Sequence, residues 1–344
     1  MACSCAPRVH LASFIKYGGA VCLTGLALLI FTVFSDQRTK PTRVEATEET
    51  PPTPIITLFT TFKPNPKRLS IYQATIRNWA SLGPHVRPLL YANLTLGKSD
   101  LVEYALQHGW SVAQTPKENW CHTPFVNHMY MDAEQRYDSE FYSYANGDIL
   151  FDDGLVRTLN AVLNKMPQKR VLVIGQRVNY ELKNYSHIPY STIDEFRSNR
   201  QVMARSVKWG LLLAIDFFIT RRAMFSWNRM AHVVVGRGGY DAYVLYYAMY
   251  RDNGTVISAT DTMQAYHLQA MNWQLSHRKD KDKDSHFNVK AIKDRENGTV
   301  GKVWNTGTIR AARMKTVLGE NGEIDIIPQT KKTRTQMSNN KVVV

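Results

Sequence analysis

The chain has 344 residues, of which 44% are hydrophobic and 21% charged, and 43 Lys and Arg against 29 Asp and Glu give a formal net charge of +14. This composition excludes a wholly disordered or collagen-like chain, and the length allows one large domain or two modest ones. Much of the excess charge lies in residues 277–344, where 15 Lys and Arg stand against 8 Asp and Glu. Positively and negatively charged residues alternate there, and the basic residues are not interleaved with aromatic ones, so we expect no nucleic-acid partner.

The N-terminus carries an apolar stretch, residues 17–34, with no charged side chain. As a helix it would be about 27 Å long, enough to cross the core of a bilayer. A cleaved signal peptide has a shorter apolar core and a small-residue cleavage site, which this sequence lacks. We therefore predict a cytosolic tail over 1–16, an uncleaved transmembrane helix over 17–34 and a polar stem over 35–53.

The orientation of this helix is predicted from glycosylation sites, because the basic residues on its two sides are nearly balanced. Four Asn-x-Ser/Thr sequons begin at Asn93, Asn184, Asn253 and Asn297. They predict a single-pass type II glycoprotein of the Golgi or endoplasmic reticulum with a lumenal body. Cys121 is the one cysteine of that body, so neither an internal disulfide nor a cysteine-based zinc site is expected.

The body alternates strand patterns with helix patterns in chain order. Strands are expected over 55–62, 86–92, 110–114, 140–151 and 171–176, and helices over 68–82, 99–108, 123–137 and 153–166. This alternation predicts an α/β domain over 54–275, with a mostly parallel sheet, helices on both faces and ligands at the carboxyl ends of the strands.

The pattern weakens after residue 176. Residues 211–220 are apolar, and the glycine-rich segment 236–241 leads into an apolar helix over 242–250. The polar segment 276–344 is expected to be basic and partly disordered. Within it, residues 303–307 are expected to dock back on the domain.

Asn146, Gly147 and Asp148 stand near the end of the apolar run 140–151. Residues two apart share one face of a strand, so Asn146 and Asp148 are expected to point together, with Gly147 allowing a close approach to the backbone. A carboxylate beside an amide is half of a shell for a hard divalent cation, completed by phosphates and water. The same residues are common in turns, and the spacing alone leaves both interpretations open.

Three further polar residues have two interpretations each. Asp241 follows the glycine-rich segment and precedes a helix, so it is either a helix cap or a general base over an open site. His267 is either a metal ligand or a buried core histidine. Asp216 is a charge within an apolar run and must be paired or functional. The commonest hydrolase, NTPase and dinucleotide-binding motifs are absent from the sequence.

Five segments occur in an order that resembles the nucleotide-diphospho-sugar transferase-like family, whose members have the GT-A glycosyltransferase fold. The segments are IITLFTTFKPNP followed by Gln73, Arg77, Asn78 and Trp79, then FYSYANGDILF, AIDFFITRR, VVVGRGGYDAYVL and ATDTMQAYHLQ. The similarity runs over residues 55–269, with a weaker echo at 304–307. It implies a Rossmann-like, mixed and mostly parallel sheet of the GT-A type, preceded here by the transmembrane helix.

The resemblance also implies a metal site. Residues 146–148 stand where the family has its Asp-x-Asp motif, with Asn146 in place of the first Asp. By this likeness Asp148 would bind Mn²⁺ or Mg²⁺ that bridges the diphosphate of the donor, and His267 would be the late metal ligand.

Three more roles follow from the same resemblance. Asp241 would be the carboxylate that binds the acceptor, and the base if the enzyme inverts. Thr60 and Thr61, at the end of the first strand, would lie near the nucleotide.

Together these features predict a glycosyltransferase that moves a sugar from a nucleotide-sugar donor to a glycan, protein or lipid acceptor. The alternative is a catalytically inactive lumenal protein of the same fold that binds carbohydrate or nucleotide, and Asn146 favours that alternative. A basic adaptor that acts through its tail is a third hypothesis.

Overall fold

The computed structural model describes residues 53–97, 99–182, 192–195, 197–198, 207–209, 215–270, 283–284, 286–298 and 300–330. The chain separates into two units, Met1–Glu49 and Thr50–Val344, and every described residue belongs to the second. The predicted tail, the predicted transmembrane helix over 17–34 and nearly all of the stem lie outside the described residues. Within the described ranges, no helix combines the length and the apolar character needed to span a membrane.

The described strands form two sheets. The large sheet has nine strands in the order β13-β12-β10-β6-β9-β4-β1-β2-β3, and the small sheet has four in the order β5-β11-β7-β8. The strands are β1 Ile56–Thr61, β2 Val86–Ala92, β3 Ser111–Gln114, β4 Phe141–Ala145, β5 Ile149–Phe151, β6 Val171–Ile174, β7 Val178–Leu182, β8 Val207–Trp209, β9 Phe217–Arg221, β10 Thr255–Ser258, β11 Ala265–Ala270, β12 Met314–Leu318 and β13 Ile324–Pro328.

The large sheet is mixed but mostly parallel. Strands β1, β2, β3 and β4 pair in parallel, as do β6, β10 and β12. Strand β9 runs antiparallel between β4 and β6, and β13 is antiparallel at one edge. The architecture is therefore the mixed α/β sheet that the sequence predicts.

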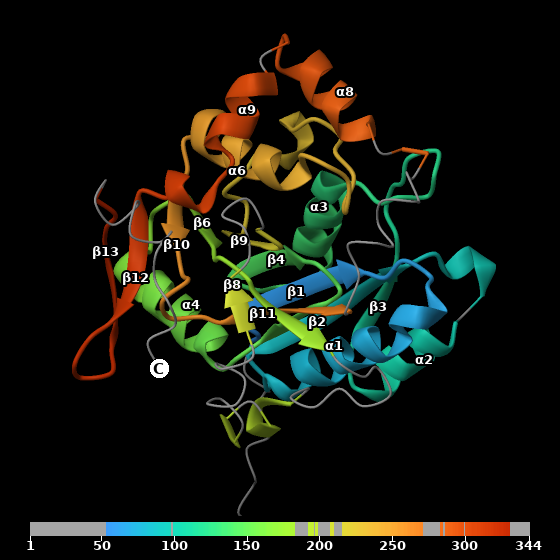
Figure 1. Ribbon diagram of the computed structural model, residues 1–344, viewed down its shortest axis with the longest axis horizontal. Coiled ribbons are helices and arrows are strands. Elements are labelled where there is room, and N and C mark those ends of the chain that lie inside the picture. Colours follow the sequence, from blue (N-terminus) through green and yellow to red (C-terminus); the bar gives the residue numbers. More distant parts are fainter. Residues whose placement is uncertain are drawn as a thin grey trace, which may run out of the picture. The chain divides into compact units, whose positions relative to one another are not determined.

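Helices cover both faces of the large sheet (Figure 1). They are α1 Leu69–Ser81, α2 Asp100–Gln107, α3 Val126–Arg136, α4 Gly154–Lys165, α6 Tyr240–Tyr250, α8 Phe287–Arg295 and α9 Val300–Thr306, with short 3₁₀ turns η1 Pro66–Arg68, η2 Leu94–Leu96, η3 Trp227–Arg229 and η4 Ile309–Ala311.

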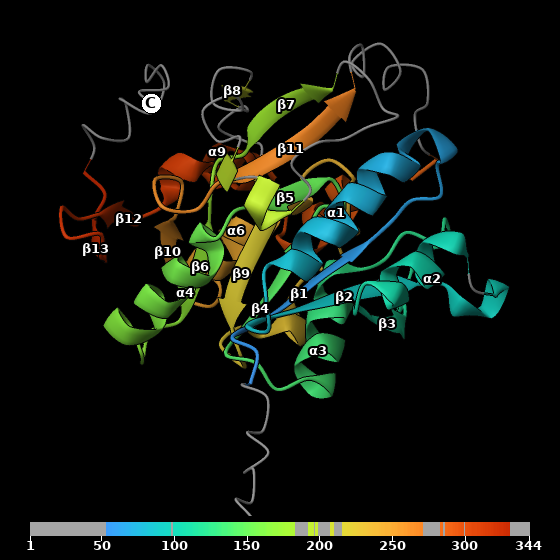
Figure 2. The same ribbon diagram turned by 90° about the horizontal axis from the view of Figure 1, so that it is seen from below.

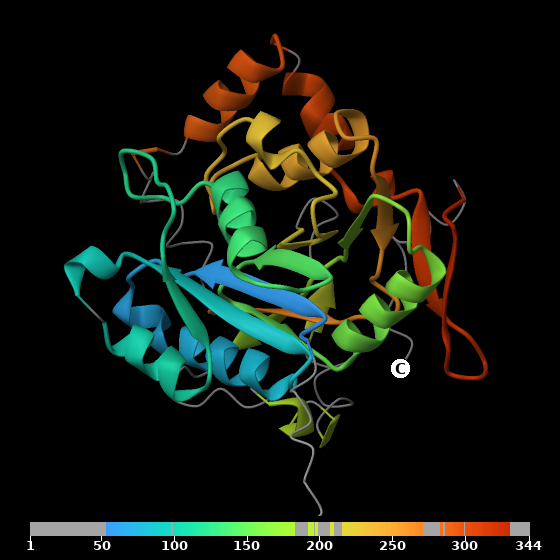
Figure 3. The same ribbon diagram turned by 180° about the vertical axis from the view of Figure 1, so that it is seen from behind.

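The alternation of side chains along β1 shows how the two faces are filled. Leu58 packs in one apolar cluster with Trp79 of α1, whereas the next residue, Phe59, packs in another with Tyr130 of α3. Figure 2 shows α1 and α3 on opposite sides of β1, and Figure 3 shows α3 against β1 and β4 from behind. Because successive side chains of a strand point to opposite faces, one strand supplies both cores.

One sequence expectation about this fold is wrong. The single strand expected over 140–151 is two strands, β4 and β5, which belong to different sheets and are separated by a turn at 146–148. Within the segment after residue 276, residues 286–328 contain α8, α9, β12 and β13, and β12 pairs with β10 of the main sheet. The expected docking of 303–307 is confirmed, because α9 packs on α6.

Candidate functional site

The carboxyl ends of the parallel strands in the large sheet gather several polar residues, most of which the sequence singles out. The last residue of β1 and residues that follow β4 and β6 meet there with the residue that precedes β9, because β9 runs in the opposite direction. These positions hold Thr61, Asn146, Arg177 and Asp216. Ligands of open α/β sheets bind at such carboxyl ends.

The 146–148 turn is held tightly at these carboxyl ends. A side chain at Gly147 would place its Cβ 2.6 Å from the ring of Phe62, so only glycine fits. The Thr75 hydroxyl donates to the Gly147 carbonyl at 3.0 Å, and the Leu268 amide donates to the Asp148 carbonyl at 2.9 Å. The turn is thereby fixed from α1 on one side and from β11 on the other.

Asp148 lies in a cluster with Arg68 and His267, which we call the Asp148 cluster. The Arg68 guanidinium donates a short hydrogen bond to Asp148 Oδ2. His267 Nε2 lies 3.3 Å from the same oxygen. Arg68 comes from the end of η1 and His267 from β11, so three distant parts of the chain meet here.

The Asp148 cluster contains buried polar atoms without a partner. Asp148 and His267 are each 7% exposed, yet Asp148 Oδ1 and His267 Nδ1 have no hydrogen-bond partner among the described residues. Burial raises the pKa of Asp148, but the His267 imidazole and the Arg68 guanidinium outweigh burial and hold the pKa well below its ordinary value. Asp148 is therefore an ionised carboxylate with one unused oxygen.

Two residues of this cluster suit a divalent cation. A carboxylate oxygen and an imidazole nitrogen are ligands that Mn²⁺ accepts, and the contacting atoms of Asp148 and His267 are adjacent. The unpartnered Asp148 Oδ1 is the observation that supports the fit. In the part of the chain that the structure describes, no group of three or more His, Cys, Asp or Glu side chains comes together, so the protein would supply two ligands and the substrate the rest.

Asn146 has different partners from Asp148. Its Nδ2 donates to Asp216 Oδ1 at 2.7 Å, and its Oδ1 accepts from the hydroxyls of Tyr144 at 3.0 Å and Tyr240 at 2.9 Å. Arg177 Nη1 donates to the other oxygen of Asp216 at 2.5 Å. These five residues form the Asp216 cluster. The expectation that Asn146 and Asp148 point together is wrong, since a turn replaces the strand.

The Asp216 cluster explains why residue 146 is an amide. Burial is the main cause that raises the pKa of Tyr144 and of Tyr240 well above 10, so both hydroxyls stay protonated and donate. Asn146 accepts these two hydrogen bonds through its oxygen and donates one to Asp216 through its nitrogen, a combination that an amide provides and an ionised carboxylate does not. An Asp at 146 would face Asp216 with a second negative charge.

Asp241 lies in the first turn of α6, next to the Asp216 cluster. The helix is capped by Gly239, and the Asp241 carboxylate accepts from the Ala242 amide at 2.9 Å. Burial, followed by the nearby charge of Asp216, raises the pKa of Asp241 to about 6 in spite of these hydrogen bonds and of Arg177. Asp241 is thus not the N-cap, and its pKa suits a proton acceptor near neutral pH.

The glycine-rich turn before Asp241 is tied to the C-terminal helix α9. Gly239 has φ of +89°, and a Cβ there would lie 1.9 Å from the ring of Trp304. Gly307 packs equally closely against Ala242, since its Cβ would lie 2.3 Å from that of Ala242. The segment 303–307 therefore fixes the start of α6 and, with it, Asp241.

Thr60 and Thr61 lie at the carboxyl end of β1. Thr60 is fully buried, and the carbonyl of Thr61 lies beside Gly147. Neither hydroxyl contacts the Asp148 cluster by a hydrogen bond that the structure describes, so a place near a nucleotide stays a prediction for both.

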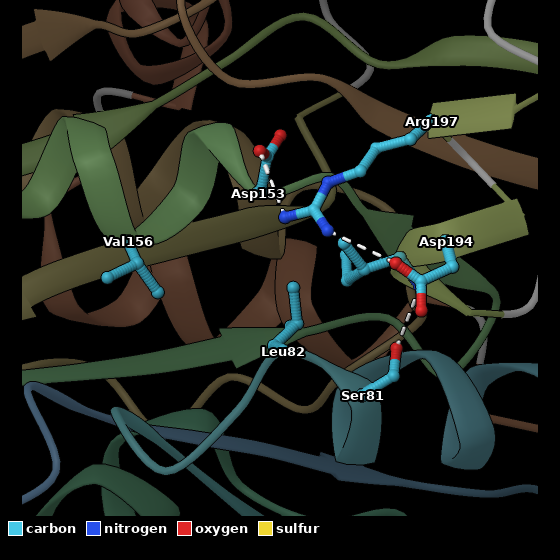
Figure 4. Close-up of a pocket in the computed structure, with 7 residues that line it drawn as sticks. Ser81, Leu82, Asp153, Val156, Asp194 and Arg197 are labelled. Atoms are coloured by element: carbon cyan, nitrogen blue, oxygen red, sulfur yellow. Dashed lines mark hydrogen bonds and ion pairs between the residues drawn. The ribbon is translucent and has the colours of Figure 1, made fainter.

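The described residues also form a pocket of about 290 Å³ away from these carboxyl ends (Figure 4). Arg197 spans it with ion pairs to Asp153 at 3.6 Å and Asp194 at 3.1 Å. Ser81 and Leu82 line it at the far end of α1, about 20 Å from Arg68 for a helix of this length. None of the predicted site residues lines this pocket.

Arg68 and Arg177 are the site residues that the sequence analysis missed. Arg177 directly follows the strand predicted over 171–176, and Arg68 comes a short loop after the strand predicted over 55–62. A cation at the carboxyl end of a parallel strand is the signal that would have marked them.

Comparison with protein-family models and with curated proteins finds no match. Among solved structures, glucosyl-3-phosphoglycerate synthase from Mycobacterium tuberculosis with Mn²⁺, UDP and glucosyl-3-phosphoglycerate is similar at 9% identity, with a TM-score of 0.39 over 70% of this chain and 80% of that one. The same enzyme with Mg²⁺ and UDP has 8% identity and a TM-score of 0.40, over 70% and 79%. TarS 1–349 of S. aureus with UDP-GlcNAc has 11% identity and a TM-score of 0.40, over 71% and 66%.

These structures are distant from this chain in both sequence and structure. At such identities and TM-scores, the comparison indicates only a distant similarity between their backbone traces and that of this chain. The role of the site rests on its own residues.

Proposed function

We propose that this protein transfers a sugar from a nucleotide-sugar donor to a hydroxyl acceptor. The observation that carries the proposal is the convergence of Asp148, Arg68 and His267 at the carboxyl ends of the parallel strands, with Asp241 beside the neighbouring Asp216 cluster. The Arg68 guanidinium suits the diphosphate of the donor, the ionised Asp148 carboxylate suits a divalent cation, and a carboxylate with a pKa of about 6 suits the acceptor proton.

The chemistry follows from where charge develops. In an inverting transfer the acceptor oxygen attacks the anomeric carbon, the bond from that carbon to the diphosphate oxygen breaks, and the acceptor proton passes to Asp241. Negative charge then grows on the leaving nucleoside diphosphate. Positive groups placed beforehand at that position stabilise the transition state without rearrangement.

Asp148 and His267 would hold Mn²⁺ or Mg²⁺ in this proposal. The metal would neutralise the departing diphosphate as a Lewis acid. Thr60 and Thr61 would lie along the nucleotide, at the end of β1.

A donor screen tests the proposal. The melting temperature of the full-length protein is measured with a panel of UDP- and GDP-sugars, with and without Mn²⁺, and donor breakdown is then followed as release of nucleoside diphosphate. We expect one donor to raise the melting temperature and to be turned over, and D148A to abolish metal-dependent turnover while it leaves the fold intact. Unchanged turnover in D148A would remove the metal role.

The second candidate is a non-catalytic protein of the same fold that binds a nucleotide or carbohydrate. Asn146 favours it, because the amide is committed to Asp216 and two tyrosines and contributes nothing to a cation. In the same screen, donor binding without hydrolysis or transfer would select this candidate.

We also propose that the body is lumenal and glycosylated, anchored by residues 17–34. Asn253 and Asn297 support this, since both are exposed in turns where a glycan can be attached. Protein from eukaryotic cells should lose mass on treatment with an N-glycosidase, and less so in N253Q/N297Q. No change of mass in the wild type would contradict the lumenal location.

A further inference from the structure

Arg68 stands between Asp148 and solvent. Its side chain is 33% exposed, whereas that of Asp148 is 10% exposed. One face of the guanidinium lies over the ring of Tyr72, with its central carbon 5.5 Å from the ring centre. Arg68 is thus held by Asp148 on the inside and remains accessible from outside.

Arg68 already provides Asp148 with the positive partner that a metal ion would provide. Both would contact the same carboxylate, and Oδ2 is shared between Arg68 and His267 in the structure. A divalent cation bound to Asp148 would lie within a few ångströms of the guanidinium, where like charges repel strongly. The cation would bind the unpartnered Oδ1 while Arg68 contacts Oδ2, so the two positive groups compete for the charge of one carboxylate and each weakens the contact of the other.

A guanidinium that leaves Asp148 needs another anion. Arg68 is anchored at the end of η1, directly before α1, so its reach is limited to the carboxyl ends of the parallel strands. A diphosphate offers oxygens that match the planar fork of arginine, which binds phosphate through two parallel hydrogen bonds. The partially exposed position allows this exchange without movement of the backbone.

We propose that Arg68 and a divalent cation are alternative partners of Asp148, and that Arg68, when released, binds the diphosphate of the donor. The diphosphate part of this inference rests on the proposed function, whereas the competition for Asp148 does not. Arg68 is then a donor-binding residue that also closes the site when donor and metal are absent.

Binding measurements separate this exchange from a merely structural ion pair. Isothermal titration measures the affinity of the full-length protein for Mn²⁺ alone, and then for UDP and GDP in the presence of Mn²⁺. The variants are R68Q, R68K and the control K67Q, which removes the same charge from the exposed neighbouring residue. Melting temperatures check that each variant is folded.

The expected effects have opposite signs. R68Q should bind Mn²⁺ about tenfold more tightly, because a charge-assisted hydrogen bond no longer competes for Asp148, and should bind the nucleoside diphosphate about tenfold more weakly. R68K keeps the charge without the planar fork, so it should lie between wild type and R68Q in both measurements. K67Q should match the wild type in Mn²⁺ affinity.

Each other outcome overturns the proposal in a recognisable way. Unchanged or weaker Mn²⁺ binding by R68Q, or no Mn²⁺ binding by any form, rules out the competition. Tighter Mn²⁺ binding with unchanged nucleotide binding rules out the role of Arg68 toward the diphosphate. If the wild type binds Mn²⁺ but neither UDP nor GDP, the proposed function fails, while the Mn²⁺ comparison still decides whether Arg68 competes.

Discussion

Two carboxylates lie at the 146–148 turn and differ in their surroundings: Asp148, within the turn, and Asp216, the partner of Asn146. Asp148 contacts Arg68 and His267 and keeps one buried oxygen without a partner in the described structure. Asp216 has both oxygens hydrogen-bonded, to Asn146 and Arg177. An unused buried oxygen is suited to bind a ligand, whereas a saturated carboxylate holds its neighbours in place. The turn thus separates a carboxylate suited to bind a ligand, Asp148, from a carboxylate that holds its neighbours in place, Asp216.

The same contrast extends to proton affinity. The pKa of Asp148 is held well below its ordinary value, whereas the pKa of Asp241, beside the Asp216 cluster, is raised to about 6. Environments that push the pKa values of two carboxylates apart assign them different tasks. Asp148 stays ionised as an electrostatic group, and Asp241 is able to exchange a proton near neutral pH.

The largest expected effect comes from removing the proton acceptor. In D241N we expect kcat for transfer to fall by about 10²–10⁴-fold, because the amide cannot take the acceptor proton. Initial rates of nucleoside diphosphate release at saturating donor measure this. D325N, which changes an exposed carboxylate on β13, is the matched control. A change in KM alone would show that Asp241 only binds the acceptor.

The next largest effect is on the free energy of unfolding, which should distinguish the Asp216 cluster from the Asp148 cluster. D216A leaves Arg177 and Asn146 without their buried partner and should lower the free energy of unfolding by about 3–5 kcal/mol. D148A should cost less than D216A, because Arg68 is partly exposed and regains water. Urea denaturation of both variants measures the difference. Equal costs would mean that Asp148 is as structural as Asp216.

An Asp in place of Asn146 tests the role of the amide. N146D places a second carboxylate against Asp216 and removes a donor, so we expect a loss of roughly 1–3 kcal/mol in the free energy of unfolding. We expect no gain in Mn²⁺ affinity, because residue 146 faces away from the Asp148 cluster. Tighter Mn²⁺ binding with unchanged stability would show that Asn146 belongs to the metal site after all.

The smallest expected effect is a shift in pH dependence. Since the pKa of Asp241 is about 6, kcat/KM should fall about tenfold for each pH unit below 6. The charge of Asp216 contributes to that raised pKa, so D216N should move the acidic limb to lower pH. If the acidic limb of the kcat/KM profile does not move in D216N, a group other than Asp241 causes it.

Stability against pH should show opposite signs for the two carboxylates. Because the folded pKa of Asp241 is raised, its contribution is present below the ordinary value of 3.8 and is lost as pH rises through about 6. For Asp148 the folded pKa is lowered, so its contribution is present above 3.8 and is lost as pH falls. Denaturation of D241N between pH 4 and pH 7, and of D148A from pH 4 downward, each compared with the wild type, measures the two trends.

Much of the fold could be predicted from local pattern. The alternating strands and helices from β1 to β6 follow apolar periodicity, which is a property of neighbouring residues. The break at Asn146 was one of two interpretations that local pattern left open, because Asn, Gly and Asp are common in turns, and the structure selects the turn, with the Phe62 ring close to Gly147. Strands β12 and β13 were missed because charged residues flank short apolar runs, and their pairing with β10 is a long-range contact.

The site was predicted in part. The sequence resemblance placed Asp148, His267 and Asp241 in one site, and the structure brings Asp148 and His267 into contact. The partners of Asp216 could not be derived, since only the antiparallel direction of β9 brings it to the carboxyl ends of the parallel strands, where Asn146 and Arg177 lie. Local periodicity predicts that a strand is present, but it does not predict the direction of that strand in the sheet.

The most direct test of the central claim is the affinity of the full-length protein for UDP and GDP with Mn²⁺, compared between wild type and D148N. If the Asp148 cluster holds the donor diphosphate, the wild type binds one of the two nucleotides and D148N loses at least about tenfold in affinity, as expected for a lost charge-assisted contact. Equal binding by D148N, in protein that melts like the wild type, would contradict the account.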